Sequence, residues 1–144
     1  MSTIVKRSWM VAAVALAVSV SLVGSWLRGQ RDECCQLDGM PLVAAYRVRV
    51  LDDREHSHVF CSVRCAEIWL RGRNMPTAKV YVTDETSGEE LLAPNAHFVR
   101  SLVWTTRVSG NRVHVFRDRA DAESHASQCR GTLLDDAQRP FAVH

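Results

Sequence analysis

The sequence lacks the surplus of basic residues that binding to nucleic acid requires. Its formal net charge is +2 over 144 residues, and Lys6, Arg7 and Arg28 supply three positive charges before residue 31, where there is no acidic residue. The remainder of the chain therefore sums to about −1. No basic surface is available for a phosphate backbone, and we expect no nucleic-acid partner.

Motifs of the common enzyme classes are also missing. The chain has no Ser/His/Asp order, no glycine-rich phosphate loop and no carboxylate dyad at a usable spacing. A thiol enzyme would need Cys35 or Cys65 as its nucleophile, but the sequence places no base beside either residue. We therefore expect a protein that is not an enzyme.

One long apolar run without charges occupies the N-terminal region. Residues 9–27 are apolar or small throughout and follow Lys6 and Arg7. This length is sufficient to cross a bilayer and exceeds the apolar region of most signal peptides. The pattern predicts a membrane segment over residues 1–30, either retained as a single-pass anchor or cleaved as a signal near residues 21–25. We expect the protein to lie in the cell inner membrane, with the rest of the chain facing the periplasm or the cell exterior.

The remaining residues, 31–144, predict an α+β domain built from two pseudo-repeated ββαβ units, at about 40–84 and about 90–135. The tripeptide His-Val-Phe at residues 58–60 recurs at 114–116, before each predicted helix, which supports the repeat. Apolar alternation, turn residues and helix caps predict the following elements: strands at 42–51, 56–60 and 78–83 with a helix at 62–71, and strands at 96–103, 112–116 and 131–134 with a helix at 118–128 capped by Asp118.

The cysteines carry the chemistry of this sequence. Four of the five lie in residues 34–70, as the adjacent pair Cys34 and Cys35 and as Cys61 and Cys65. A helix from Cys61 would place Cys61 and Cys65 one turn apart on one face, and its N-terminus would favour a thiolate at Cys61. A hairpin is expected to return the earlier pair to the same place.

A soft metal ion is the favoured ligand for this arrangement, because thiolates select Cu(I), Zn(II) or iron–sulfur clusters. Adjacent cysteines chelate one ion poorly, so Cys35 is the expected ligand and Cys34 its exchange partner. Met40 either adds a thioether ligand or packs. A disulfide, common in exported proteins, and inert packing of the thiols are the alternatives. Cys129 is expected to be a buried apolar residue.

Four segments form a recognisable series along the chain: residues 35–41 (Cys-Gln-Leu-Asp-Gly-Met-Pro), 60–65 (Phe-Cys-Ser-Val-Arg-Cys), 79–84 (Lys-Val-Tyr-Val-Thr-Asp) and 96–99 (Ala-His-Phe-Val). In this order they resemble the NosL-like accessory proteins of nitrous oxide reductase. The resemblance implies an envelope-anchored copper-binding protein with paired ββαβ units. The segment 60–65 is separately similar to the YHS/TRASH type of metal-binding cysteine motif.

The chain also departs from the family pattern. Asp38 stands where the family has the second cysteine of Cys-x-x-Cys-Gly-Met, and no methionine follows Met75. Cys65 matches a family cysteine, whereas Cys61 is additional. The resemblance thus implies a copper site with an altered ligand set.

These observations predict a membrane-anchored envelope protein that binds Cu(I) and passes it on, a metallochaperone-like accessory protein for metalloenzyme maturation. Its expected metal ligands are Cys35, Cys65, Cys61, Cys34 and Met40. Its expected partner is an envelope metalloprotein or metal transporter that donates or accepts the ion. A structural Zn(II) site in a TRASH-like interaction module is the alternative function, and a thiol redox protein is a third.

Overall fold

The computed structural model describes residues 34–73, 75 and 77–141. The membrane segment expected over residues 1–30 lies outside this part of the chain. Within it, neither helix has the length and apolar character needed to cross a bilayer.

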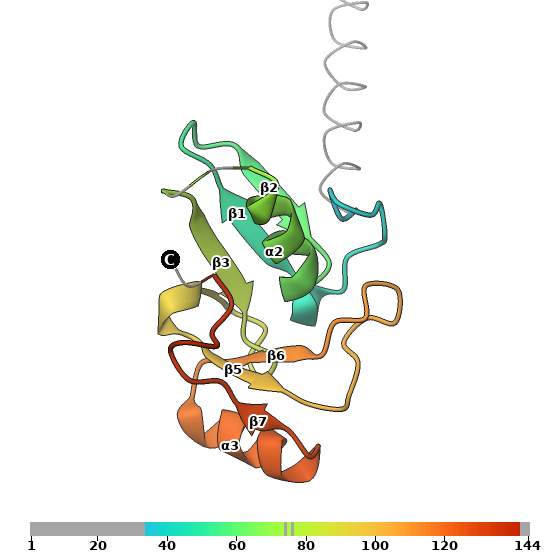
Figure 1. Cartoon of the computed structure of the whole chain (residues 1–144), viewed down its shortest axis with the longest axis vertical. Helices are drawn as coiled ribbons and strands as arrows, with labels where there is room; N and C mark the ends of the chain where they lie inside the picture. The colour runs from blue at the N-terminus through green and yellow to red at the C-terminus, as the bar shows by residue number, and fades with distance from the viewer. Residues whose placement is uncertain (1–33, 74, 76, 142–144) are drawn as a thin grey trace, which may run out of the picture. The chain divides into compact units, whose positions relative to one another are not determined.

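Four antiparallel strands form the first sheet, in the order β2-β1-β3-β4. Its strands are β1 (Val48–Leu51), β2 (Ser57–Phe60), β3 (Lys79–Thr83) and β4 (Glu90–Leu92), and α2 (Val63–Arg71) connects β2 to β3. In β1 the valines are buried and alternate with half-buried residues, as expected for a strand with one face on the core. The helix α2 covers this sheet (Figure 1).

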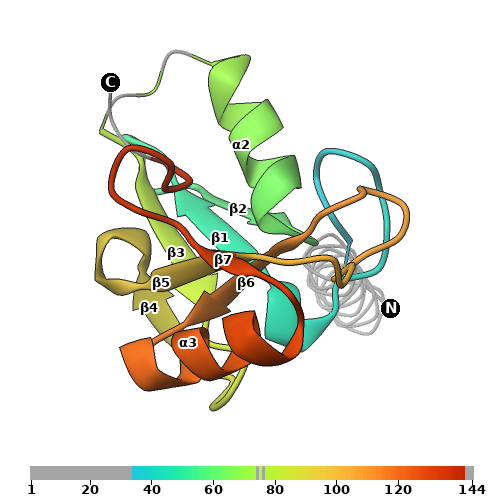
Figure 2. The same ribbon diagram turned by 60° about the horizontal axis from the view of Figure 1, so that its bottom comes forward.

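The second sheet has three antiparallel strands in the order β6-β5-β7. Its strands are β5 (His97–Arg100), β6 (Val113–Phe116) and β7 (Thr132–Leu133), and α3 (Arg119–Gln128) connects β6 to β7. The two helices lie apart, with strands of both sheets between them (Figure 2). In each sheet the first strand is central, the second flanks it, and the strand after the helix takes the other flank.

The α+β class and the predicted succession of strands and helices are therefore present, but several boundaries differ. The first strand begins at Val48 rather than at residue 42, because Ala44–Tyr46 forms a 3₁₀ turn, η1. The strand expected to reach residue 103 ends at Arg100. Strand β4 was not predicted. Asp118 precedes α3 as expected, but its side chain makes no capping hydrogen bond.

One core joins the two sheets. Phe98 of β5 and Val115 of β6 belong to the same buried cluster as Val48 and Phe60 of the first sheet. Ala93, in the short 3₁₀ helix η2 (Ala93–Asn95), is also buried in this cluster. The second unit thus completes the core on which the first unit is built.

The turn after β3 adds polar links between the sheets. Asp84 Oδ1 accepts a hydrogen bond from the backbone N–H of Arg117 (3.1 Å), and Glu85 Oε1 accepts one from Val115 (3.1 Å). The backbone N–H of Glu85 donates to the Val115 carbonyl in return (3.0 Å). The orientation of β6 relative to the first sheet is fixed by these bonds.

Candidate metal centre

A tight loop over residues 35–40 supplies half of the centre. The Cys35 N–H donates to the Met40 carbonyl (2.8 Å), and the Gly39 N–H donates to the Cys35 carbonyl (2.8 Å). Gly39 has φ of +71°, a conformation that residues with a Cβ rarely adopt. Met40 N–H also donates to Asp38 Oδ1 (3.1 Å), which holds the carboxylate over the loop.

This loop is fastened to the end of β2. The Gln36 N–H donates to the Val59 carbonyl (3.0 Å), and the Gln36 side-chain oxygen lies 2.8 Å from His58 Nδ1. His58 Nε2 lies 3.3 Å from the Asp52 carboxylate. The histidine on this strand therefore positions the loop and does not join the sulfur atoms.

The other half of the centre is the junction between β2 and α2. Cys61 follows the last residue of β2, and Ser62 caps α2 by accepting a hydrogen bond from the Cys65 N–H (3.3 Å). Cys65 lies in the first turn of the helix. Cys61 lies before the cap, outside the helix, which begins at Val63 rather than at the predicted residue 62, and the two thiols still face each other.

Loop and junction bring four potential ligands together. The Cys65 thiol donates to Asp38 Oδ2 at 3.3 Å, and Cys61 Sγ lies 3.5 Å from the same oxygen. The sulfurs of Cys61 and Cys65 are 3.6 Å apart. With the sulfur of Cys35 included, all four ligand atoms lie within 4.8 Å of one another.

The group is buried on its sulfur side and open on its carboxylate side. Cys35 is 2% exposed, Cys61 1% and Cys65 2%, whereas Asp38 is an exposed residue. An ion would reach the three sulfurs past the carboxylate. The arrangement thus combines three buried sulfurs with one exposed carboxylate.

Burial controls the protonation of the metal-free centre. It raises the pKa of Cys61, and the neighbouring Cys65 raises it further. It also raises the pKa of Cys65 to about 11, although a hydrogen bond with Ser62 opposes the rise. The expectation that the helix N-terminus favours a thiolate at Cys61 is therefore wrong, because burial outweighs the helix. Burial alone would raise the pKa of Asp38, but hydrogen bonds, led by one with Cys35, lower this pKa overall.

Three of the five predicted ligands lie in the group. These are Cys35, Cys61 and Cys65, and the hairpin returns the earlier segment as expected. Cys34 is exposed, forms an isolated bridge with Pro41 and lies outside the group. Met40 is 36% exposed at the rim of the loop and is not among the four clustered residues.

The structure also bears on the disulfide alternative and on the expected burial of Cys129. All five cysteines are free, so no disulfide closes the centre. Cys129 lies half-buried at the end of α3, with its sulfur 3.9 Å from His125 Nδ1. It takes no part in the group.

Asp38 is the residue that sequence reasoning missed. It was identified as a departure from Cys-x-x-Cys-Gly-Met, yet no ligand role was assigned to it. The structure places its carboxylate where the missing sulfur would be expected, beside the thiols of the β2–α2 junction. The sequence did contain a signal for this role: an aspartate, whose carboxylate can bind a metal, stands at a position where the family has a cysteine.

The spacing fits a small cation. Metal–sulfur bonds of about 2.3 Å and metal–oxygen bonds of about 2.1 Å place sulfurs about 3.8 Å apart, and sulfur and oxygen about 3.6 Å apart, around a tetrahedral ion. The separations among Asp38, Cys61 and Cys65, of 3.3, 3.5 and 3.6 Å, approach these values, and the Cys35 sulfur lies within 4.8 Å of the other three ligand atoms. Three sulfurs with one carboxylate match the donor set of a soft or borderline ion.

Fold and centre together define an α+β domain with one sulfur-rich cation site built on a loop and a strand–helix junction. No family model matches the sequence, and no curated protein matches it. Among solved structures, the fold is similar to the crystal structure of the copper chaperone NosL from Shewanella denitrificans. The two are 22% identical with a TM-score of 0.64, over 78% of this chain and 92% of that chain. The fold is therefore NosL-like, as the sequence motifs indicated.

Proposed function

We propose that this protein is a membrane-anchored Cu(I) chaperone of the cell envelope, held by residues 9–27 and facing the periplasm or exterior. Support comes mainly from the group formed by Cys35, Asp38, Cys61 and Cys65, three buried sulfurs with one exposed oxygen. Soft sulfur ligands prefer Cu(I), and the solved structure of similar fold is called a copper chaperone.

Transfer would proceed by ligand exchange. The three buried sulfurs hold the ion, and Asp38 is the exposed member of the group, which an incoming ligand can reach. An incoming thiolate, thioether or imidazole from an envelope metalloprotein or metal transporter replaces the carboxylate first and the sulfurs afterwards. Because thiols must lose their protons to bind the ion, uptake releases protons and weakens on acidification.

Structural zinc is the second candidate function, and Asp38 is the observation that favours it. A hard carboxylate is a better ligand for Zn(II) than for Cu(I), and the separations among Asp38, Cys61 and Cys65 are close to those around a tetrahedral Zn(II). In that case the ion would stabilise the loop and junction of an interaction module. A thiol redox protein is less well supported, because raised pKa values at Cys61 and Cys65 disfavour reactive thiolates.

Anaerobic metal titration of the full chain separates these functions. The Cu(I) proposal expects one tightly bound ion that is lost in the double variant Cys35→Ser, Cys65→Ser, while circular dichroism shows that the fold survives. Cys129→Ser is the matched control and keeps the ion. Unfolding of the double variant on metal loss would favour structural zinc.

A conservative substitution of Asp38 provides a second test that separates the Cu(I) proposal from the Zn(II) alternative. Asp38→Asn keeps the size of the side chain at an exposed position, so the fold is retained. If Cu(I) is held by the sulfurs, its affinity changes by less than about threefold, whereas Zn(II) loses a ligand and weakens by about tenfold or more. A larger loss for Cu(I) than for Zn(II) contradicts the sulfur-based proposal.

A further inference from the structure

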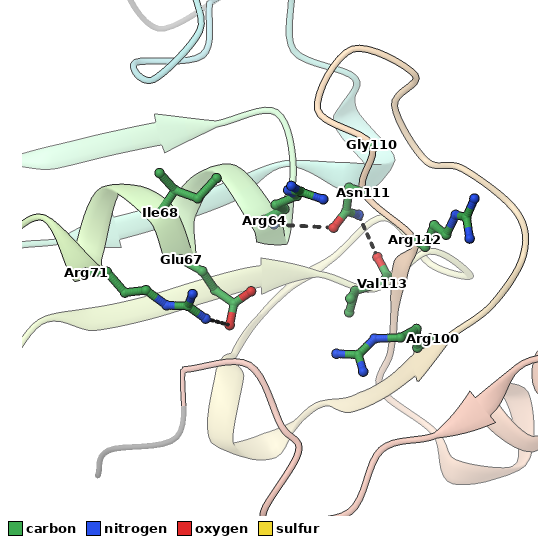
Figure 3. A pocket seen from close by; sticks show the side chains of 9 residues that line it. All are labelled: Arg64, Glu67, Ile68, Arg71, Arg100, Gly110, Asn111, Arg112 and Val113. Carbon is green, nitrogen blue, oxygen red and sulfur yellow. Dashed lines mark hydrogen bonds and ion pairs between the residues drawn. The ribbon is translucent and has the colours of Figure 1, made fainter.

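A cleft of about 380 Å³ lies between α2, the helix that carries Cys65, and the β5–β6 hairpin. Arg64 and Arg71 line it from the helix, and Arg100 and Arg112 line it from the hairpin (Figure 3). Glu67 is the one acidic residue of this lining. The side chains of Arg64, Arg71 and Arg100 thus surround one carboxylate, whereas the Arg112 guanidinium points away from it (Figure 3).

The positive charge of the cleft is not neutralised within the described residues. Arg71 is paired with Glu67 at 3.8 Å, and the guanidinium of Arg112 stacks on Trp104 with 4.8 Å to the ring centroid. Arg64 and Arg100 form no ion pair in this part of the chain. Two guanidiniums therefore keep their full set of donors for a ligand.

Glu67 is the one carboxylate among these arginines. Arg64 and Arg71 come from α2 and Arg100 comes from the facing hairpin, and all three line the same cleft as Glu67 (Figure 3). One carboxylate is insufficient to balance the three cations.

The walls of the cleft are fixed without a ligand. Asn111 is 2% exposed and accepts a hydrogen bond from the Arg64 N–H (3.3 Å), while its amide donates to Thr105 Oγ1 (2.6 Å) and the Val113 carbonyl (2.9 Å). Ser62, the cap of α2, donates to Ser109 Oγ at 3.2 Å. Helix and hairpin are thereby held in register, which reduces the ordering cost of binding.

Apolar side chains continue the surface next to the cleft. Leu102, Val103, Trp104 and Val108 are 59%, 45%, 47% and 66% exposed. A Cβ added at Gly110, in the cleft lining, would lie 3.8 Å from the Trp104 ring and 3.7 Å from Arg64 Nη1, so this apolar segment borders the arginines directly. Exposed tryptophan and arginine side by side are typical of protein interfaces.

We propose that this cleft docks an acidic segment, with at least two carboxylates, of the protein that exchanges metal with the centre. The identity of that partner as a metal donor or acceptor rests on the proposed function. Arginine forks bind carboxylates with two parallel hydrogen bonds, and the apolar border gives a polypeptide more to contact than a free small anion. Arg64 lies next to Cys65 in α2, so a segment bound here would bring its protein to the metal centre.

The test uses the full chain, metal-free, in a non-ionic detergent. The arginine Nε–Hε signals are followed by NMR during titration with a synthetic octapeptide of alternating glycine and glutamate, and with its glutamine counterpart. We expect the Arg64 and Arg100 signals to shift with the glutamate peptide only. In the variant Arg64→Gln, Arg100→Gln, binding should weaken about tenfold or more. Arg71→Gln, at a mostly exposed side chain, should weaken it less.

The single variants Arg64→Gln and Arg100→Gln are also measured, and Arg54→Gln is their matched control, because it removes one positive charge from a turn outside the cleft. Equal weakening in this control, or equal binding of the glutamine peptide, overturns the proposal. The proposal is also overturned if citrate or inorganic phosphate shifts the same signals and displaces the peptide at a concentration lower than that of the peptide. That result would identify a site for small anions. Because the protein is metal-free, these outcomes are independent of Cu(I) stoichiometry, on which the proposed function stands.

Discussion

The two strand–helix junctions share an aromatic framework but differ in the residues around it. In each unit, a histidine and a phenylalanine of the strand before the helix stack on one ring of that helix. The stacked sets are His58, Phe60 and Trp69 in the first unit and His114, Phe116 and His125 in the second. Ring centroids lie 4.5 and 5.2 Å apart in the first set, and 4.2 and 5.1 Å apart in the second.

The residues that follow each phenylalanine make the difference. Cys61 and Cys65 in the first unit correspond to Arg117 and Asp121 in the second. Arg117 forms an ion pair with Glu89 at 2.8 Å and offers no metal ligand. The framework thus orients a strand end and a helix start, and the identity of two side chains decides whether a cation site results.

The two helices also contribute unequally to the core. Helix α2 buries Val63, Cys65, Ala66 and Trp69, whereas α3 buries only Ala122. The metal centre is therefore built on the better anchored helix. The second unit relies more on hydrogen bonds to the turn after β3.

The largest effect should come from truncating the ring of the first framework. Trp69 is 6% exposed, and Trp69→Ala should lower the free energy of unfolding by about 3–5 kcal/mol, because a buried cavity replaces the ring. His125→Ala is the matched change and should cost less than about 1 kcal/mol, since His125 Nε2 is buried without a hydrogen-bond partner. Urea denaturation measures both. Equal losses would contradict the proposed asymmetry.

A titratable pair in the second framework gives the next effect. Burial lowers the pKa of His114, but the hydrogen bond and charge of Glu85, 2.9 Å away, raise it above its usual value overall. Burial lowers the pKa of His125, and the charge of His114 lowers it further. The protonated His114 therefore stabilises the fold fully below about pH 6.5, and this contribution is lost as pH rises through its folded pKa.

We expect Glu85→Gln to bring the pKa of His114 below its usual value, since burial remains while the carboxylate is gone. The variant should lose about 2 kcal/mol of stability at pH 6, and less as pH rises. Imidazole NMR signals followed against pH, with urea denaturation at each pH, measure both changes. A pKa for His114 that stays high in the variant would show that Glu85 does not control it.

Two glycines with left-handed backbone separate metal binding from stability. Gly39 (φ +71°) and Gly88 (φ +76°) have no heavy atom within 4 Å of an added Cβ, so alanine at either costs only backbone strain, about 1–2 kcal/mol. Gly39→Ala should also weaken metal binding, because the loop carries Cys35 and Asp38. Gly88→Ala should leave binding unchanged. Calorimetric metal titration and thermal unfolding test the pair, and equal metal affinity would contradict a role for the loop geometry.

The sequence was informative where a pattern is local. Cysteine spacing and the repeated His-Val-Phe indicated a strand–helix junction, and the hairpin between the cysteine pairs indicated their convergence. Asp38 was missed because carboxylates are common at turns, and only the fold brings it to the thiols. The stacking of His125 on His114 and Phe116 depends on helix orientation, which no local pattern determines.

Boundary errors have the same origin. Apolar alternation continues through residues 42–47, yet Ala44–Tyr46 forms a 3₁₀ turn that precedes β1. Strand β4 pairs with β3, and its Glu90 forms ion pairs with Arg47 (2.9 Å) and Arg49 (2.8 Å), which precede it by about 40 residues. Such contacts between distant segments are not visible in residue order.

The smallest expected difference concerns the two helix caps. Ser62 accepts a hydrogen bond from the Cys65 N–H, so Ser62→Ala should lower the free energy of unfolding by about 1 kcal/mol. Asp118 stands at the equivalent position before α3 but makes no side-chain capping bond, and Asp118→Ala should cost only about 0.3 kcal/mol. Because Ser62 also orients Cys65, its loss should weaken metal binding, whereas the Asp118 variant keeps it. Denaturation and metal titration of both variants measure this. If the two variants lose the same stability, the N-terminus of α2 is no better fixed than that of α3, and the cap does not contribute to positioning Cys65.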